Sequence, residues 1–250
     1  FDVAQTFSSS RLRCSAYETD GGEHNIRVAL RRLPLEVPPL AQLGTPSQLE
    51  AVTARGKGLF LITGPTGAGK TTTLAAMLDF VNQSRAVHIQ TIEKPIEYIL
   101  HRRKSVVSQC EVPTNVASFG AGINAALRHR PDIIAIGEIN DRETVTEMLH
   151  AASSGHLVLA TMHTNSCEET IAALLQFYDG TEAVQKRILL SSALVGIVSQ
   201  ALLPSVSGDR LVLACELLLS NPPIAQAVRD GKFHHLRNAM RDGRQEGMRT

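Results

Sequence analysis

The sequence predicts an α/β fold in which helices cover a mostly parallel sheet. Short apolar runs of strand length alternate along the chain with segments whose apolar residues recur at helical spacing. A glycine-rich loop separates the first of these runs from the helix that follows it. Strands that are apolar throughout belong to sheets with both faces covered. We therefore expect helices on both sides of one sheet in residues 42–250.

The first 33 residues have the pattern of a β-hairpin. Apolar and polar residues alternate over 11–16 and over 26–31, and the residues between them, 19–23 (TDGGE), are a turn signal. Two strands are too few to be stable alone. We therefore expect residues 1–33 to be the remnant of a larger N-terminal domain that begins before Phe1.

Residues 34–41 have the composition of an extended linker. Three prolines fall within six positions, at Pro34, Pro38 and Pro39, and they prevent a helix there. We expect this proline-rich linker to be stiff and to connect the N-terminal remnant to the second domain.

Hydrophobic periodicity predicts the elements of residues 42–250. Strands are expected at 58–63, 86–92, 133–137, 157–162 and 210–216. Helices are expected at 70–83, at 118–129 and after Asp141, whose carboxylate can cap the helix start. From residue 168 onward the chain is predicted to be mostly helical apart from the last strand, and the apolar stretch at 188–203 has helical character.

The composition is that of a globular chain and argues against other classes of protein. The 250 residues are 43% hydrophobic and 20% charged, which argues against disorder. The formal net charge of +1 is low for a protein that grips duplex nucleic acid, so we expect no direct DNA binding. The four cysteines form no CxxC pair, which fits a reduced cytosolic compartment.

Residues 64–71 read GPTGAGKT, which is the G-x-x-x-x-G-K-T phosphate loop. Its glycines let successive backbone N–H groups point at an anion, and the dipole of the following helix is directed at the same place. We expect the Lys70 ammonium to reach the β- and γ-phosphates and the Thr71 hydroxyl to bind Mg²⁺.

Acidic residues at the ends of two predicted strands can complete this site. Glu138 follows the strand at 133–137, and the carboxyl ends of parallel strands lie beside a phosphate loop. We expect Glu138 to orient or deprotonate the attacking water. Glu93 and Glu97 follow the strand at 86–92 and could face the same pocket, although their pattern alone favours an ordinary surface loop.

Two histidines flank the predicted strand at 157–162. His163 lies at its carboxyl end, where a sensor of the γ-phosphate would be placed. His156 enters from the other end, and its spacing alone indicates no function.

Four segments resemble, in order and spacing, the motifs of one protein family. GPTGAGKTTT, TIEKPIEY, RPDIIAIGEIND and SSGHLVLATMHTNS are similar to the Walker A, Asp-box, Walker B and His-box segments of the bacterial secretion ATPases. These ring motors serve type II secretion, type IV pili, and type IV secretion or conjugation. The resemblance covers roughly residues 10–240 and is strongest to the pilus retraction branch (PilT-like), with conjugative and type IVB secretion motors as neighbours.

The resemblance implies a RecA-like P-loop NTPase domain preceded by a truncated α+β (PAS-like) domain. It implies that ATP and Mg²⁺ are bound and that Glu93 and Glu138, with Thr71, lie at the metal and the attacking water. It also implies functional roles for His156 and His163. The residues implied in nucleotide binding are Gly64, Pro65, Thr66, Gly67, Ala68, Gly69, Lys70, Thr71 and Thr72.

Arginines of the N-terminal domain complete the site in this family. Arg13 and Arg31 align with them here, and Arg11, Arg27 and Arg32 are nearby alternatives. An arginine that reaches a transferring phosphoryl group raises the rate by roughly 10³ to 10⁵ in GTPases.

The resemblance also implies how such a motor works in the cell. It implies a homohexameric ring that is cytoplasmic, peripheral to the inner membrane, and acts on an inner-membrane platform protein. Three positions depart from the family pattern: Lys94 replaces the second acid of the Asp box, Asn140 replaces an arginine after Glu138, and Ala225 replaces an arginine of the retraction signature.

Two alternatives to an ATP-hydrolysing motor remain at this stage. Lys94 beside the metal site suggests an ATP-binding assembly subunit with little turnover. A RecA-like nucleic-acid translocase is disfavoured because the chain has only seven Phe and three Tyr, and no Trp, to form stacking platforms.

Overall fold

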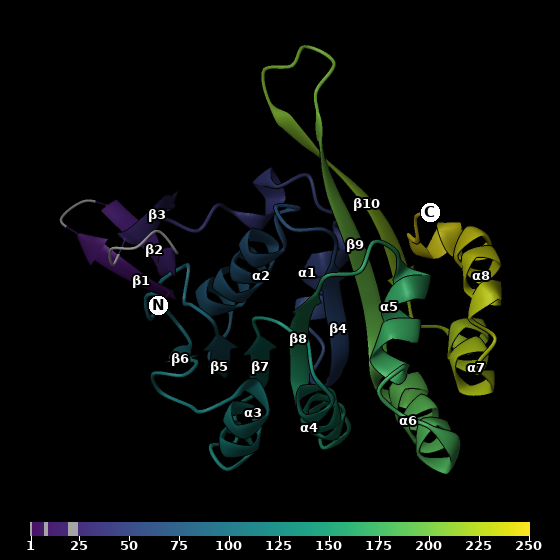
Figure 1. The fold of residues 1–250 in the computed structure, drawn as a ribbon. Helices are drawn as coiled ribbons and strands as arrows, with labels where there is room; N and C mark the ends of the chain where they lie inside the picture. The colour runs from purple at the N-terminus through teal and green to yellow at the C-terminus, as the bar shows by residue number, and fades with distance from the viewer. Residues whose placement is uncertain (1, 8–9, 20–24) are drawn as a thin grey trace.

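A small antiparallel sheet precedes a larger, helix-covered sheet along the chain (Figure 1). The structure is a computed structural model that describes residues 2–7, 10–19 and 25–250. The small sheet has the order β1-β2-β3 and consists of β1 (Asp2–Phe7), β2 (Ser10–Thr19) and β3 (Asn25–Leu33). β2 and β3 are the two predicted strands, whereas β1 was not anticipated. The predicted turn at 19–23 falls, after Thr19, outside the described residues.

Within the described residues the larger sheet has seven strands in the order β10-β9-β4-β8-β7-β5-β6. All neighbouring pairs are parallel except β9 and β10, which confirms the prediction of a mostly parallel sheet. The strands are β4 (Gly58–Thr63), β5 (His88–Glu93), β6 (Val106–Glu111), β7 (Ile133–Ile136), β8 (Leu157–Met162), β9 (Leu194–Pro204) and β10 (Leu211–Leu219).

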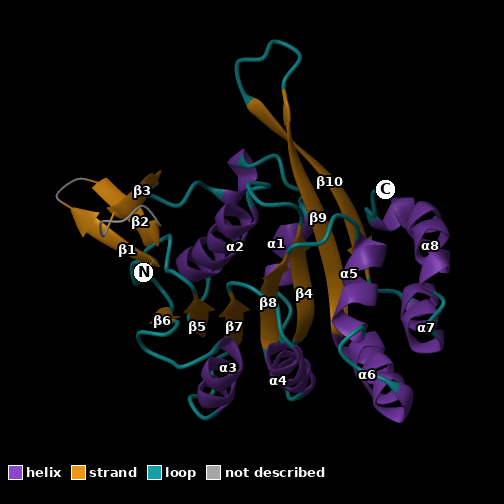
Figure 2. Ribbon diagram, in the orientation of Figure 1, coloured by secondary structure: helices purple, strands orange, loops and turns teal. Residues whose placement is uncertain are grey.

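The side chains of β4 point alternately into two apolar cores on opposite faces of this sheet. Leu59 and Leu61 enter one core, Phe60 and Ile62 enter the other, and all four are fully buried. The first core packs against α3 (Phe119–Leu127), α4 (Arg142–Ser153), α5 (Cys167–Leu175), α6 (Gly180–Ala193), α7 (Pro222–Asp230) and α8 (Leu236–Asp242). The second packs against η1 (Leu40–Gln42), α1 (Gln48–Thr53) and α2 (Lys70–Ser84) (Figure 2).

The prediction of a mostly helical region after residue 168 is wrong for residues 194–204, which form β9. The run begins Leu-Val-Gly-Ile-Val, and its β-branched residues favour a strand once a partner is available. β9 has two partners, because it lies between the buried strand β4 and the antiparallel strand β10. A Cβ on Gly196 would lie 2.5 Å from the Leu218 carbonyl oxygen, so the two strands approach too closely there for a larger residue.

The far end of the β9–β10 hairpin extends beyond the rest of the sheet (Figure 1). Leu203 and Val206 are exposed there. None of the helices in the described ranges has the length and apolar character that crossing a bilayer requires.

Candidate nucleotide site

The phosphate loop connects β4 to α2 at the carboxyl edge of the sheet. α2 begins at Lys70, directly after Gly69, which has a left-handed backbone with φ of 85°. Gly64 has φ of 141° and lies against the backbone carbonyl of Gln200 on β9, where a Cβ would collide. Both glycines are therefore required by the backbone path, and the loop places the amino end of α2 toward the space above the sheet.

Lys70 is buried at the base of this loop. Its ammonium donates hydrogen bonds to the carbonyl oxygens of Gly64 at 2.8 Å and Pro65 at 3.0 Å. The same Nζ lies 3.2 Å from His163 Nδ1. Burial lowers the pKa of Lys70, and the nearby Glu138 carboxylate opposes that shift. An ammonium group only donates hydrogen bonds, so His163 Nδ1 must be the acceptor in this contact. The ring proton of His163 then lies on Nε2.

Glu138 and His163 meet beside Lys70. His163 Nε2 lies 3.5 Å from Glu138 Oε1, with side-chain exposures of 46% and 38%. These exposures leave room for a water or a phosphate group at both side chains. Glu138 follows β7 and His163 follows β8, which are neighbouring parallel strands, so the sheet topology brings the two residues together as the sequence predicts.

Glu93 ends β5 and reaches the same cavity. Its Oε1 accepts hydrogen bonds from Thr91 Oγ1 at 2.6 Å and Gln109 Nε2 at 3.0 Å. Burial raises the pKa of Glu93, while these two hydrogen bonds oppose the shift. A half-buried carboxylate with the Thr71 hydroxyl lining the same cavity supplies the oxygen donors that Mg²⁺ prefers.

A cavity of about 610 Å³ contains most of the residues that the sequence singles out. It is lined by Thr66, Gly67, Ala68, Gly69, Lys70, Thr71 and Thr72 of the loop and helix, and by Glu93, Glu138 and His163. Gly64 and Pro65 are not in its lining and contribute through their carbonyl oxygens to Lys70. Lys94 also lines the cavity and is exposed.

Arg13 and Arg31 reach this cavity from the N-terminal sheet. They are cross-strand neighbours on β2 and β3, and Arg13 Nη1 lies 3.4 Å from Glu97 Oε1. The alternatives Arg11, Arg27 and Arg32 do not line it. Arg27 and Arg32 are exposed. Arg11 is buried, and its guanidinium donates to the carbonyl oxygens of Ile96 and Glu97.

His156 lies at the amino end of β8, at the opposite edge of the sheet from the phosphate loop. Its Nδ1 lies 3.2 Å from the Ala151 carbonyl oxygen, and its own carbonyl accepts a hydrogen bond from Gly58 N. His156 is therefore separated from the cavity, and the structure does not bring it together with the other predicted site residues.

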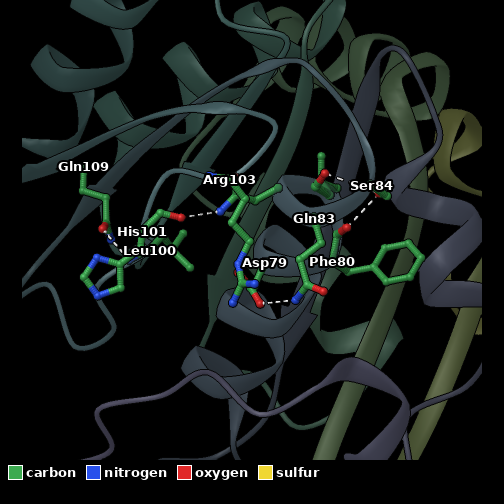
Figure 3. Close-up of polar contacts among 10 residues, drawn as sticks. Asp79, Phe80, Gln83, Ser84, Leu100, His101, Arg103 and Gln109 are labelled. Carbon is green, nitrogen blue, oxygen red and sulfur yellow. Dashed lines mark hydrogen bonds and ion pairs between the residues drawn. The ribbon is translucent and has the colours of Figure 1, made fainter.

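The sequence reasoning missed several residues that shape the site. The Gln109 amide donates to the Glu93 carboxylate and to the Tyr98 carbonyl oxygen. Its own oxygen accepts a hydrogen bond from Leu100 N at 2.8 Å (Figure 3). Tyr98 Oη lies 3.0 Å from Thr72 Oγ1. Leu202 and Leu211 line the cavity from the hairpin. No local motif marks these residues, because only the folded chain brings them to the site from distant parts of the sequence.

Comparison with known proteins identifies the family. The family model described as "Type II/IV secretion system protein" matches residues 6–246. The chain is 37% identical to the type IV pilus retractation ATPase PilT of Pseudomonas aeruginosa (strain PAO1), covering 96% of this chain and 69% of that protein. It is 35% identical to the twitching motility protein of Neisseria gonorrhoeae, covering 96% and 64%.

Solved structures agree with this comparison. The pilus retraction motor PilT with bound ADP superposes with a TM-score of 0.89 at 41% identity, covering 96% of this chain and 69% of that one. The ATPase DotB of Legionella pneumophila superposes with a TM-score of 0.85 at 29% identity, covering 97% and 68%. The chain thus spans about two thirds of the length of these proteins. The predicted resemblance and RecA-like fold are confirmed, and the chain belongs to the type II/IV secretion system protein family.

Proposed function

We propose that this chain, an ATPase of the type II/IV secretion family, is a motor that powers pilus retraction or secretion. The observation that carries the proposal is the shared cavity: the phosphate loop, Glu138 and His163 line it from the large sheet, and Arg13 and Arg31 line it from the N-terminal sheet. A nucleotide bound there would contact both sheets. Its hydrolysis would therefore change the contacts between two parts of the chain that a proline-rich segment connects.

The residues of the cavity have complementary roles in hydrolysis. The backbone N–H groups of the loop and the amino end of α2 bind phosphate oxygens, and the Lys70 ammonium shifts its hydrogen bonds from the loop carbonyls to the β- and γ-phosphates. Glu138 accepts a proton from the attacking water, whose oxygen bonds to the γ-phosphorus as the bond to the β–γ bridging oxygen breaks. Arg13 and Arg31 stabilise the charge on the transferring group.

Thr71, Glu93 and Glu138 would hold Mg²⁺ through their oxygen atoms, directly or through water. When bound, this ion neutralises charge on the phosphate oxygens. His163 holds its proton on Nε2, facing Glu138, and therefore orients that carboxylate in the cavity.

The finer features of the proposal follow the family. We infer a homohexameric ring, cytoplasmic and peripheral to the inner membrane, that acts on a platform protein of a pilus or secretion machine. The relative PilT is described as a pilus retraction motor, and this similarity supports a motor function for the chain. His156, which lies outside the cavity, would then serve packing or a contact between neighbouring subunits.

Phosphate release by the purified chain tests the proposal. We expect Lys70→Ala to abolish ATP turnover and Glu138→Gln to lower kcat at least about 100-fold, as removal of an acid-base group does. Glu147→Gln is the matched control, since Glu147 is a half-buried residue of α4 that does not line the cavity, and this variant should retain parental turnover. Parental activity in Glu138→Gln would remove this residue from the mechanism.

One observation favours a second candidate, an ATP-binding assembly subunit with little turnover. Lys94 and Glu93 both line the cavity, so the Lys94 ammonium would compete with Mg²⁺ for the Glu93 carboxylate. This candidate predicts that the parent chain binds nucleotide tightly but releases no phosphate at steady state. It also predicts that Lys94→Glu restores phosphate release, and both results together would favour it over the motor.

A further inference from the structure

Arg11 connects the N-terminal sheet to the loop that follows β5. Its Nε donates to the Glu97 carbonyl oxygen at 3.2 Å, and one Nη donates to the Ile96 carbonyl. The other Nη donates to Thr6 Oγ1 on β1 at 3.2 Å. Arg11 is only 7% exposed. A buried guanidinium is stable only when its donors are used, and here three of its nitrogens have acceptors.

Arg11 and Arg13 contact the same short loop, Arg11 at the Ile96 and Glu97 carbonyls and Arg13 at the Glu97 carboxylate. They are two residues apart on β2 and therefore point to the same face of the strand. Arg11 lines a cavity of about 710 Å³ with Thr6, Glu36 and Asp79, whereas Arg13 lines the nucleotide cavity and pairs with Glu97. Residues 96 and 97 thus contact one arginine from the lining of each cavity.

This loop is itself fixed to the larger sheet. Ile96 N donates to Glu111 Oε2 at 2.9 Å, and the Tyr98 hydroxyl meets Thr72 on α2. Gln109 binds both Glu93 and the Tyr98 carbonyl. The neighbouring segment at 100–103 is tied to α2, where Arg103 pairs with Asp79 at 3.5 Å (Figure 3). The two carbonyl oxygens that accept hydrogen bonds from Arg11 are therefore held in place relative to the nucleotide cavity.

Among the described residues, the strands of the N-terminal sheet have no other large contact with the larger sheet. In the described part of the chain, none of β1, β2 and β3 forms an extensive contact with a helix or strand of residues 40–250. β3 is exposed along its length except at Leu33. The position of β2 over the cavity therefore depends strongly on the polar contacts of Arg11 and Arg13.

We propose that Arg11 is a positioning residue: its fork of hydrogen bonds to the Ile96 and Glu97 carbonyls fixes β2 so that Arg13 projects into the nucleotide cavity. This inference rests on the proposed function and adds a residue that does not touch the nucleotide. Lysine cannot replace it, because an ammonium on a flexible stem does not present the planar donor fork that spans two successive carbonyls.

A double-mutant cycle on the full chain separates positioning from general stability. We expect Arg13→Ala to lower kcat for ATP, and Arg11→Ala and Arg11→Lys to lower it about tenfold with a smaller change in KM. If Arg11 acts through Arg13, the double variant Arg11→Ala/Arg13→Ala is no slower than Arg13→Ala alone within about threefold. A purely structural role makes the two losses multiply, and that result would overturn the inference.

Arg32→Ala is the matched control. Arg32 is an exposed arginine of the same sheet that does not line the nucleotide cavity, so its removal changes the charge but not the anchor. We expect parental turnover from this variant. Parental turnover from Arg11→Ala as well would contradict the inference.

Calorimetric binding of ATPγS with Mg²⁺ keeps the test independent of turnover. Arg11→Ala and Arg13→Ala should weaken binding non-additively, even if the parent chain hydrolyses ATP slowly. Failure of the proposed motor function would appear as absent turnover in the parent. Failure of the Arg11 inference would appear as additive losses of affinity or as no loss from Arg11→Ala.

Discussion

At the scale of single residues, the site depends on side chains that hold others in place. Glu93 is the clearest case, because its carboxylate is half-buried and receives two hydrogen bonds. Burial disfavours the charged form, whereas these donors favour it. Burial outweighs the donors, so the pKa of Glu93 is raised, while the two hydrogen bonds limit that rise and fix the direction of the carboxylate.

Removing the Gln109 donor tests this arrangement. We expect Gln109→Leu to lower kcat for ATP about tenfold, because Glu93 loses one hydrogen bond and the loop at 98–100 loses its anchor. Gln83→Leu is the control, since Gln83 donates the same kind of amide–carboxylate bond to Asp79 outside the nucleotide cavity. Steady-state phosphate release measures both variants, and equal losses would show that Gln109 has no special role.

Cys167 allows a prediction about pH. Burial raises the pKa of its thiol, which is fully enclosed at the start of α5. The folded state holds this proton more tightly than the unfolded state does. Cys167 therefore lowers the free energy of unfolding as the pH rises above 9.0, the ordinary pKa of the group.

Thiol labelling followed by mass spectrometry checks the state of Cys167. In the folded chain at pH 8 we expect iodoacetamide to modify Cys167 at least about 100-fold more slowly than in urea, because both access and thiolate are suppressed. Cys110, which is only half-buried, serves as the internal reference. Equal labelling of the two cysteines in the folded chain would contradict the prediction.

At the scale of elements, local signals predict some features well. Asp141 caps α4 as the sequence predicts: its carboxylate accepts from Thr144 N at 2.8 Å and from Thr144 Oγ1 at 2.9 Å. α4 follows the Walker B segment directly, so this cap also fixes the end of the loop that carries Glu138.

Two helix caps of the same residue type give a matched comparison. We expect Asp141→Ala to lower the free energy of unfolding by about 1 kcal/mol, the usual effect of losing a capping side chain. Asp179 occupies the same position before α6 but makes no capping hydrogen bond, so Asp179→Ala should have a clearly smaller effect. Urea denaturation measures both, and a larger effect of Asp179→Ala would refute the argument.

The errors of sequence reasoning also belong to this scale. The buried strands β4, β7 and β8 were predictable because each is an apolar run next to a motif. β9 was not, since a short apolar segment has the same pattern in a helix and a strand until its partners are known. β6 (VVSQCE) carries polar residues on an edge and gives no strong signal.

The same reasoning explains what was predictable of the site. Residues within contiguous motifs, such as Lys70 and Glu138, were identified directly from their neighbours. Gln109 was missed because its role comes from the pairing of β6 with β5, which places it beside the strand that ends in Glu93. Arg11 was named only as an alternative to Arg13, and its contact with residues 96 and 97 depends on how the two sheets are placed.

At the scale of the whole molecule, nucleotide should stabilise the fold by binding to the native state alone. We expect ADP with Mg²⁺ at 100 times its Kd to add about 2.7 kcal/mol to the free energy of unfolding. For a chain of this size that corresponds to a rise of about 5–10 °C in Tm. Differential scanning fluorimetry measures the shift. Lys70→Ala should lose most of it, and an undiminished shift in that variant would place the nucleotide elsewhere.

The two-residue spacing of Arg11 and Arg13 determines how far Arg13 moves when β2 tilts. Residues two apart on a strand are about 7 Å apart. If β2 swivels about Arg11 as a pivot, a tilt of only about 10° displaces Arg13 by about 1 Å, a misplacement that can slow an enzymatic step about 100-fold. If the chain is the motor proposed above, a force on the N-terminal sheet would slow hydrolysis before the two sheets separate visibly, and turnover would then depend on the opposing load.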